Sequence, residues 1–518
     1  MSELGLDGGP EAQRMSETEL KFGVPERATA DVERRLRQLG GRAQAIESHY
    51  WDSADRRLAR QGLSLRLRKA GGRWEQTLKA PGASPLERQE ETVSRPGRWE
   101  AGGPAPEPWM FAGSPAGERL DAALGDRRKG ALLEPVHTSL VTRRAVDVEI
   151  GGAEIEIALD RGAIAAGSRS VSLCELEAEL THGDVSGLIA FARASVDVHG
   201  VWLSTITKAA RGGRLATGNA GTRAVKATPP ALANVASGEE IFRAVLRSCL
   251  DQVLANASVL AEGDVDDDVV HQLRIGIRRL RTAWRELGMW SGSLGASWEA
   301  PAAEVFRALG EYRDRRTVAA TMHERLLAAG SPEPALAPAS KSAPLDPVDR
   351  VRSASFQQAL LDLVAFLMTP ATPASAAPAH AAGRDEREDA ITTHLRKLHA
   401  RLARDARRFE RLPELERHRV RKRLKRLRYL SELVAPLYRQ SRVRAFLEKL
   451  EPAQDELGRY MDVIVAMDLA KEMAEAGAPR AWFNVGWLKA QLPDALRRCG
   501  SALDRVASAK PFWSAKRG

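Results

Sequence analysis

The spacing of apolar residues changes once along this chain, and this change restricts the possible folds more than any other feature. Up to about Glu179, apolar and polar residues alternate between groups of Gly, Pro and Asp, which is typical of antiparallel strands. After Gly238 the alternation is replaced by the 3.6-residue spacing of amphipathic helices. A chain of 518 residues can form at least two domains, so we expect a β-rich domain followed by a helical one.

The first half predicts eight strands and two helices. The strand segments are residues 18–24, 47–53, 63–69, 74–80, 87–94, 138–149, 153–160 and 171–181. Helical spacing covers residues 28–39 and 185–197. Eight antiparallel strands with few helices favour a sheet that closes on itself. The predicted fold class is therefore α+β, with an N-terminal eight-stranded antiparallel β tunnel or barrel and a C-terminal all-α domain.

One face of these strands is ionic. Charged residues recur at alternate positions, as in Glu17, Glu19 and Lys21, whereas apolar residues such as Leu65 and Leu67 occupy the opposite face. For a single strand, a solvated charged face is the ordinary explanation. Its recurrence on several strands, with both signs of charge, favours instead a polar lumen and an apolar outer surface covered by helices.

A lumen with both signs of charge suits a complex of phosphate and metal. Mg²⁺ and Mn²⁺ prefer oxygen ligands, and Lys and Arg bind phosphate oxygens. The candidate metal ligands are Glu17, Glu19, Glu177 and Glu179. The candidate phosphate-binding residues are Lys21, Arg66, Arg68, Lys79, Arg88 and either Arg143 or Arg144.

The first half resembles the CYTH family, the triphosphate tunnel metalloenzymes, over residues 16–215. The motifs, in the family's order, are Glu17-x-Glu19-x-Lys21, Tyr50-Trp51-Asp52, Arg66-x-Arg68, Trp74 to Lys79, Glu154-x-Glu156, Asp160-Arg161-Gly162, Glu175-x-Glu177-x-Glu179, and Lys208 near Arg211-Gly212. The resemblance implies a tunnel that binds a linear triphosphate and hydrolyses it with Mg²⁺ or Mn²⁺. Adenylate cyclase, thiamine triphosphatase and a catalytically idle polyphosphate-binding scaffold remain alternatives.

The same resemblance implies roles for single residues. Glu17 and Glu19 would bind the metal, whereas Glu177 and Glu179 would bind a second metal or orient the attacking water. Lys21 joins Glu177 and Glu179 as a catalytic residue. The residues implied to bind triphosphate are Lys21, Arg66, Arg68, Lys79, Arg88, Arg143 and Lys208.

A four-residue motif occurs twice in the helical half. The residues are His271, Arg274, Arg278 and Arg281, and then His418, Arg421, Lys425 and Arg428 with the same spacing. At about 100° per residue, the four positions of each motif fall within about 80° and share one helix face. We therefore expect two repeated helical bundles, near residues 239–330 and 385–475, whose basic faces form an electropositive channel.

These motifs resemble the CHAD domain, a helical module named for its histidines. Leu309-Gly310 and Leu457-Gly458, each followed by an Asp four residues after its Gly, complete the resemblance. It implies long-chain polyphosphate as the ligand of all eight motif residues. Together the two resemblances imply a protein similar to bacterial inorganic triphosphatases. A basic run such as residues 419–428 also suits a nonspecific nucleic-acid patch, but the repeated spacing argues against nucleic acid as a specific ligand.

The distribution of charge agrees with this division. The formal net charge is +10, with 32 basic and 31 acidic residues up to Gly238 and 46 against 37 after it. Matched charges suit a lumen that also holds a metal, and an excess of positive charge suits a polyanion ligand.

Composition gives the remaining boundaries and the expected location. We expect disorder over residues 1–15, a tunnel domain over 16–215, a linker over 216–238 and a helical domain over 239–510, with Ala/Pro-rich loops at 331–347 and 369–383. No apolar run approaches the ~18 residues of a membrane span. Three widely separated cysteines suit a reducing compartment. The prediction is a cytoplasmic protein, with an association with polyphosphate granules following from the expected ligand.

Overall fold

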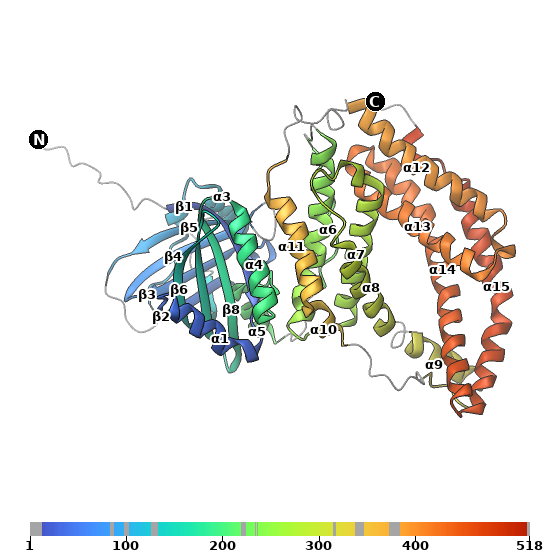
Figure 1. Ribbon diagram of the computed structural model, residues 1–518, viewed down its shortest axis with the longest axis horizontal. Coiled ribbons are helices and arrows are strands. Elements are labelled where there is room, and N and C mark those ends of the chain that lie inside the picture. Colours follow the sequence, from blue (N-terminus) through green and yellow to red (C-terminus); the bar gives the residue numbers. More distant parts are fainter. Residues whose placement is uncertain are drawn as a thin grey trace, which may run out of the picture. The chain divides into compact units, whose positions relative to one another are not determined.

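The computed structural model describes residues 13–82, 87–97, 103–125, 133–218, 224–233, 235, 237–313, 318–336, 346–371 and 384–514 (Figure 1). We expected disorder over residues 1–15: residues 1–12 lie outside these ranges, whereas residues 13–15 belong to the first strand and are not disordered. Most of the two Ala/Pro-rich loops and the side chains of Glu17 and Arg88 also lie outside the described part. The chain divides into two compact units. The first contains residues 1–224, 254–269 and 351–368, and the second contains residues 225–253, 270–350 and 369–518.

The alternating half of the sequence forms one sheet of nine strands in the described part of the first unit. They are β1 (Gln13–Gly23), β2 (Arg42–Ser53), β3 (Ser64–Ala70), β4 (Arg73–Pro81), β5 (Glu87–Arg95), β6 (Leu133–Ile150), β7 (Ala153–Ala166), β8 (Arg169–His182) and β9 (Trp202–Leu203). The first eight correspond to the eight predicted strands. With two residues, β9 is too short for an alternating pattern to reveal it.

The sheet closes into a tunnel. Its strands follow the order β5-β4-β3-β2-β6-β7-β8-β1-β9, and β1 also pairs with β5. The first half of β1 pairs with β5 over residues 13–18, and the second half pairs with β8 over residues 18–23. Because side chains alternate along each strand, one set points into the lumen and the other set points outward. The predicted α+β fold with an N-terminal tunnel is confirmed.

Helices cover the apolar outer surface. In the first unit they are α1 (Glu26–Gln38), α2 (Arg57–Arg60), α3 (Pro115–Leu124), α4 (Val185–His199) and α5 (Lys208–Thr217), with the 3₁₀ helix η1 (Pro108–Phe111). Leu65 and Leu78 are buried in one core with Phe111 and Leu120. Each such side chain contributes roughly 1.5–3 kcal/mol of hydrophobic free energy when it is fully buried. The sequence predicted α1 and α4 but not α2, α3 or α5.

Two segments that follow the linker in sequence belong to the first unit. They are the C-terminal part of α6 (Gly238–Ala261) and α11 (Ala354–Met368). The backbone N–H of Leu203 donates to Oε1 of Gln357 at 2.9 Å, and the N–H of Thr205 donates to Oγ of Ser258 at 3.0 Å. The boundary between the units in space therefore differs from the domain boundary expected from composition.

The second unit is helical in its described part. It contains the start of α6, together with most of α7 (Asp267–Leu287) and of α10 (Pro347–Arg352), and the whole of α8 (Glu299–Arg313), α9 (Ala319–Ala328), α12 (Arg384–Ala406), α13 (Glu414–Val434), α14 (Gln440–Glu475) and α15 (Trp482–Ala507). None of the helices in the described residues combines the length and the apolar character needed to cross a membrane.

The duplicated motif lies on α7 and α13, and apolar spacing fixes its orientation. On α7 the buried side chains are Leu273, Ile277 and Leu280, at positions i, i+4 and i+7. On α13 the equivalent buried residues are Val420, Leu424 and Leu427. Since these stripes face the core, the histidine and the basic residues of each motif lie on a different side of their helix.

Candidate functional site

Cations and carboxylates face one another on one wall of the tunnel. Arg66 on β3 pairs with Glu90 on β5 at 3.3 Å, and Lys79 on β4 pairs with the same carboxylate. Arg68 pairs with Glu75 at 3.1 Å. Burial by itself would raise the pKa of Glu90, but Arg66 and Lys79 lower it to about 2. Three cations share two carboxylates here, so this wall has positive charge available for an anion.

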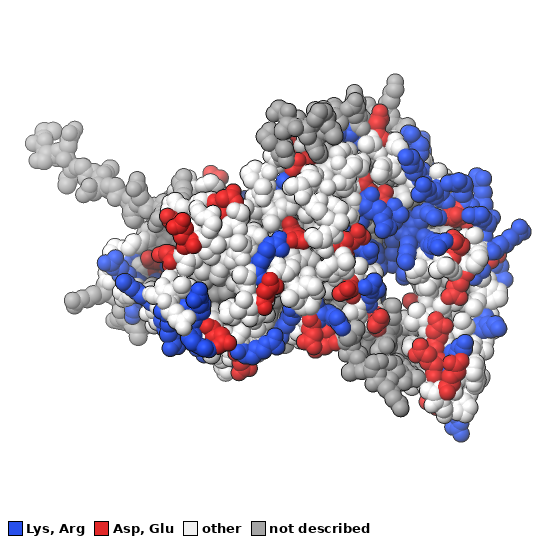
Figure 2. Space-filling model, in the orientation of Figure 1, with Lys and Arg blue, Asp and Glu red and all other residues white. Residues whose placement is uncertain are grey.

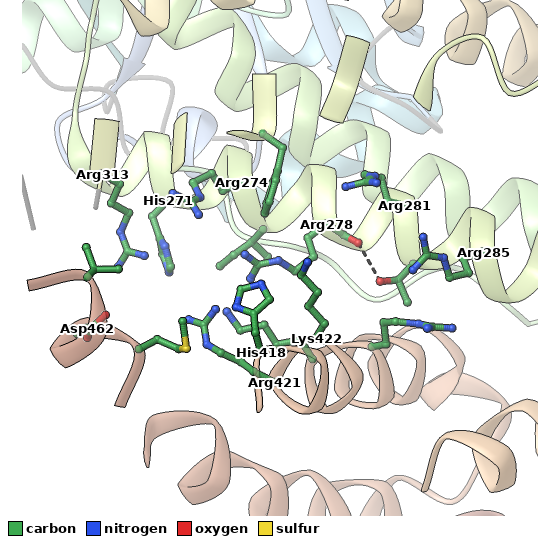
Figure 3. A pocket seen from close by; sticks show the side chains of 17 residues that line it. His271, Arg274, Arg278, Arg281, Arg285, Arg313, His418, Arg421, Lys422 and Asp462 are labelled. Atoms are coloured by element: carbon green, nitrogen blue, oxygen red, sulfur yellow. Dashed lines mark hydrogen bonds between the residues drawn. The ribbon is translucent and has the colours of Figure 1, made fainter. Parts of the chain in front are cut away.

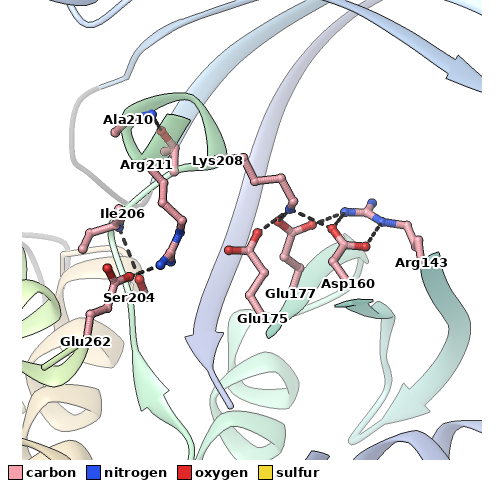
Figure 4. A network of polar contacts seen from close by, with 11 residues as sticks. Arg143, Asp160, Glu175, Glu177, Ser204, Ile206, Lys208, Ala210, Arg211 and Glu262 are labelled. Atoms are coloured by element: carbon pink, nitrogen blue, oxygen red, sulfur yellow. Dashed lines mark hydrogen bonds and ion pairs between the residues drawn. The ribbon is translucent and has the colours of Figure 1, made fainter. Parts of the chain in front are cut away.

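The first residue of α5 reaches into a group of three carboxylates (Figure 4). Nζ of Lys208 lies 2.7 Å from Asp160 and 2.8 Å from Glu177, and it also pairs with Glu175. Ligand oxygens of the three carboxylates lie within 4.8 Å of one another. Burial would lower the pKa of Lys208, but Glu175, Glu177 and Asp160 raise it well above its usual range. The ammonium group therefore stays charged.

Arg143, and not Arg144, faces the lumen. Nε and Nη2 of Arg143 each donate to Asp160 at 2.8 Å, and Nη2 also pairs with Glu177. Arg144 donates instead to the backbone carbonyl of Gly41 at 2.8 Å. Adjacent strand residues point to opposite faces, so only one of the two can enter the tunnel.

β1 places a carboxylate and an ammonium group opposite the carboxylates of β8. Glu19 lies across from Glu179, and Lys21 lies across from Glu177. Glu179 lies in turn across from Glu156 of β7. Burial and then the nearby Glu177 raise the pKa of Glu19, whereas burial lowers the pKa of Lys21. Glu19 is therefore a buried carboxylate whose desolvation the charges of Lys21, Lys79 and Lys208 offset only in part.

A second candidate site lies in the helical unit (Figure 3). A pocket of about 450 Å³ lies between α7 and α13, with further side chains from α8 and α14. Among the described residues that line it, Asp462 is the one carboxylate; Asp314, which follows Arg313 in the sequence, lies outside the described residues. The charged and histidine residues that line it are His271, Arg274, Arg278, Arg281, Arg285, Arg313, His418, Arg421, Lys422, Lys425, Arg426 and Asp462.

Positive charge in this pocket is poorly compensated. Burial, followed by repulsion from Arg278 and Arg421, lowers the pKa of Lys425 to about 5. Burial and the neighbouring arginines also lower the pKa of His271 to about 4. The guanidinium of Arg278 lies 5.0 Å from the ring centre of Phe306, a cation–π contact that adds no negative charge. A bound anion would relieve this repulsion.

Each half of the chain matches the model of a known family. Residues 15–212 match the family model of the CYTH domain, and residues 244–471 match that of the CHAD domain. The chain is a CYTH domain followed by a CHAD domain. Both resemblances seen in the sequence are confirmed. CYTH domains act on triphosphates, so the tunnel has an activity related to triphosphate, and CHAD domains are associated with binding polyphosphate.

Three solved structures are similar to parts of the chain. The CHAD domain of the plant Ricinus communis is 26% identical, covers 55% of this chain and 97% of its own length, and has a TM-score of 0.44. A candidate adenylate cyclase of Bacillus halodurans is 20% identical over 36% of this chain and 90% of its own, with a TM-score of 0.25. A candidate adenylyl cyclase of Hippeastrum, whose structure is said to reveal a dominant triphosphatase activity, is 16% identical over 39% of this chain and 96% of its own, with a TM-score of 0.29.

The CYTH tunnel gathers most of the candidate residues from distant parts of the sequence. Glu17 and Arg88 are paired in register where β1 meets β5. The other candidates, whose side chains are described, are Glu19, Lys21, Arg66, Arg68, Lys79, Arg143, Glu177, Glu179 and Lys208. The set of candidates omitted Asp160, Glu175, Glu90 and Glu75. Glu175 lies two residues before Glu177 on the same strand, so its side chain points to the same face, and alternation alone could have identified it as a residue of the lumen.

Seven of the eight motif residues of the CHAD domain line the pocket. The eighth, Arg428, does not line it. Its Nε donates to Glu432 at 2.7 Å, and its Nη1 donates to Gln454. Arg281 lines the pocket but also pairs with Glu299 at 3.3 Å. The motif had not identified Arg285, Arg313, Lys422 or Arg426, which also line the pocket.

The carboxylates of the CYTH domain fit a divalent cation. Glu19, with its raised pKa, lies across from Glu179, so both can contribute oxygens to an ion that supplies the missing positive charge. Glu177 is different, because Lys208 and Arg143 already contact its two oxygens. A metal ligated by Glu177 would have to displace or share one of these cations.

Proposed function

We propose that the tunnel hydrolyses inorganic triphosphate with Mg²⁺ or Mn²⁺, and that the CHAD domain binds long-chain polyphosphate. The proposed hydrolysis rests on one observation: the closed lumen holds cations and carboxylates together. The cations are Arg66, Lys79 and Arg143, and the carboxylates are Glu19 and Glu177. A linear triphosphate requires several cations along its length, and a metal requires carboxylates beside them. The lumen offers both.

The arginines of the lumen are oriented before any ligand binds. The planar fork of Arg143 is held by the two hydrogen bonds that it donates to Asp160, and Arg66 is held by the one that it donates to Glu90. Fixed cations of this kind stabilise negative charge that develops on a transferring phosphoryl group, because little reorganisation is needed. The proposed triphosphate-binding set is Lys21, Arg66, Arg68, Lys79, Arg88, Arg143 and Lys208.

Glu17, Glu19, Glu177 and Glu179 are the proposed ligands of the metal. A bound Mg²⁺ or Mn²⁺ would polarise a phosphoryl oxygen and lower the pKa of a coordinated water. Glu177, Glu179 and Lys21 are the proposed catalytic residues, since a carboxylate on β8 can accept a proton from the attacking water and an ammonium on β1 can hold a phosphate oxygen. Burial would raise the pKa of Glu177, but Lys208 and Arg143 hold it well below its usual range, so this carboxylate stays ionised and can accept a hydrogen bond from the attacking water.

Phosphate release tests the enzymatic part. Purified full-length protein with Mg²⁺ or Mn²⁺ should release phosphate from tripolyphosphate faster than from ATP or thiamine triphosphate. Glu19→Gln should reduce turnover at least a hundredfold, in line with the ~10²–10³-fold effect of removing a single group that stabilises the transition state. Glu118→Gln is the matched control, because Glu118 is exposed on α3 and belongs to none of the tunnel motifs. If tripolyphosphate stays intact with either metal, the proposed hydrolysis is wrong.

Calorimetric titration with long-chain polyphosphate tests the binding part. The pocket, with many cations among the described residues that line it, should bind the chain with an affinity that falls as salt rises. Arg274→Gln combined with Arg421→Gln should weaken this binding. Because any polyanion contact depends on salt, competition decides the ligand: short polyphosphate should displace RNA from the protein, whereas RNA should not displace polyphosphate.

A further inference from the structure

Five arginines line a second hollow in the CHAD domain, apart from the pocket of α7 and α13. The hollow has a volume of about 520 Å³ and lies where the end of α12 meets α13. Figure 2 shows Lys and Arg gathered over these two helices. The lining residues are Arg401, Arg404, Asp405, Arg407, Arg408 and Arg423.

The carboxylate in this hollow cannot neutralise its cations. Asp405 is buried and pairs with Arg423, and it also lies 3.6 Å from Arg408. Arg401, Arg404 and Arg407 form no ion pair within the part of the chain that the structure describes. Five arginines therefore face one aspartate, and this leaves a local excess of positive charge.

Many other exposed arginines of this protein carry an acidic partner on their own helix. Arg34 pairs with Asp31, and Arg459 pairs with Glu456 at 2.7 Å. Such pairs, three residues apart, are the ordinary way in which a helix surface balances its charge. The hollow departs from this pattern at several neighbouring positions at once.

The arginines of the hollow also repel one another. Burial, followed by the positive charges of Arg401, Arg426 and Arg404, lowers the pKa of Arg423. Guanidinium groups present planar pairs of N–H donors that match phosphate oxygens. An oligomeric phosphate is therefore a ligand that would both satisfy these donors and remove the repulsion.

The hollow and the pocket use different sides of the same helix. Arg421 and Lys425 of α13 line the pocket, whereas Arg423, midway between them in sequence, lines the hollow. Two residues correspond to about 200° of helix rotation, so Arg423 projects nearly opposite to Arg421 and Lys425, whereas Arg426, which also lines the pocket, lies only about 60° from Arg423 around the helix. A helix is only about 10–12 Å wide, and a long linear anion can reach both sides of it.

The chemistry of the lining favours polyphosphate over nucleic acid. All six lining residues are Arg or Asp, so the hollow has no aromatic side chain against which a base could stack. Proteins that bind single strands combine basic grooves with such stacking. Polyphosphate offers charge without bases and requires only the cations.

We propose that this hollow is a second anion site, at which Arg401, Arg404, Arg408 and Arg423 bind phosphoryl groups of a long polyphosphate chain that also occupies the pocket. The inference rests on the proposed binding of polyphosphate by the CHAD domain and extends it to a second face of α13. Two linked contacts raise the overall affinity through effective concentration, by as much as ~10²–10⁴-fold. The second site should therefore matter for long chains and not for short ones.

Calorimetry on the full-length protein tests this dependence on chain length. The triple variant Arg401→Gln, Arg404→Gln, Arg408→Gln should weaken binding of long-chain polyphosphate at least tenfold and should leave the affinity for tripolyphosphate unchanged. The matched control removes three surface cations around the turn between α14 and α15, by Lys471→Gln, Arg480→Gln and Lys489→Gln, and should bind both ligands like the wild type. Circular dichroism of each variant verifies folding.

The outcomes separate this inference from the proposed function. If the triple variant binds long chains as tightly as the control, the second site is wrong, and the binding belongs to the pocket alone. If the triple variant and the control lose affinity equally, the effect is general charge and the second site is also wrong. If the wild type does not bind polyphosphate at all, the proposed function of the CHAD domain fails first. If RNA competes with long polyphosphate on equal terms, the hollow is a nucleic-acid site instead.

Discussion

Replacing Lys425 with methionine should change the number of protons that the CHAD domain takes up when it binds a polyanion. Lys425 lies on α13 and lines the pocket. Burial, then Arg278, Arg421, Arg274 and Arg313, lowers its pKa from 10.5 to about 5. A pH of 7 is thus about two units above the pKa of this amine, and only about one molecule in a hundred carries the proton.

A bound polyphosphate reverses the sign of the charge around this amine. If the ligand raises the pKa of Lys425 above about 8, more than nine molecules in ten become protonated at pH 7. Binding should therefore take up about one proton at Lys425, and part of a further proton at His271 and His418, whose pKa values burial also lowers. By linkage, uptake of one proton makes the affinity rise about tenfold for each pH unit that the pH falls, within the range between the two pKa values of Lys425.

Calorimetry in two buffers with different ionisation enthalpies measures this uptake. Lys425→Met retains the length of the side chain and removes the titrating group, so the uptake should decrease by about one proton. Lys449→Met, at an exposed position of α14, is the control and should leave the uptake unchanged. Equal uptake by the wild type and Lys425→Met would refute the reasoning, and so would a wild type that takes up no proton.

Three further predictions concern the tunnel. Gly212→Ala would place a Cβ within the ring of His137 and should lower the free energy of unfolding by about 1–3 kcal/mol. The adjacent Gly213 has open space around it, so Gly213→Ala should leave this free energy unchanged when the two variants are compared by urea titration. Glu90→Gln should lower the free energy of unfolding by about 3 kcal/mol at pH 7, because the folded-state pKa of Glu90 is lowered to about 2. This contribution is present above pH 4.5 and is lost as the pH falls towards 2, so the free energies of unfolding of the wild type and the variant should converge at about pH 2. Glu262→Gln removes the 2.6 Å ion pair of Glu262 with Arg211, a residue of α5. Amide hydrogen exchange should therefore become faster in α5 and stay the same in α3, which serves as the internal control.

The periodicity of the sequence revealed most of the fold because it records which side of each element is buried. Leu65 and Leu67 alternate with Arg66 and Arg68, and this pattern already separates an apolar outer surface from an ionic lumen. The two-residue β9 and the four-residue α2 each span only about one period of their pattern, so the pattern does not repeat within them. No local signal could therefore identify them.

The site was predicted less completely because its charges are paired across strands. Alternation shows that Arg143 and Arg144 point to opposite faces of the sheet, but it does not show which of the two faces is the lumen. That depends on how the strand is aligned with its neighbours. The two hydrogen bonds from Arg143 to Asp160 settle that choice. Likewise, spacing placed Arg428 at the edge of the motif face, but its contacts with Glu432 and Gln454 keep it out of the pocket.

The sequence by itself determined the two halves of the protein, the ionic face of the strands and the duplicated basic face of the helices, because each is a property of neighbouring residues. Tertiary structure alone decided that Lys208 enters the group of Asp160, Glu175 and Glu177. It also decided that part of α6 and α11 join the unit of the tunnel. The physical reason is that contacts between residues far apart in the chain depend on how the sheet closes and how helices dock on it, and local periodicity carries no information about either.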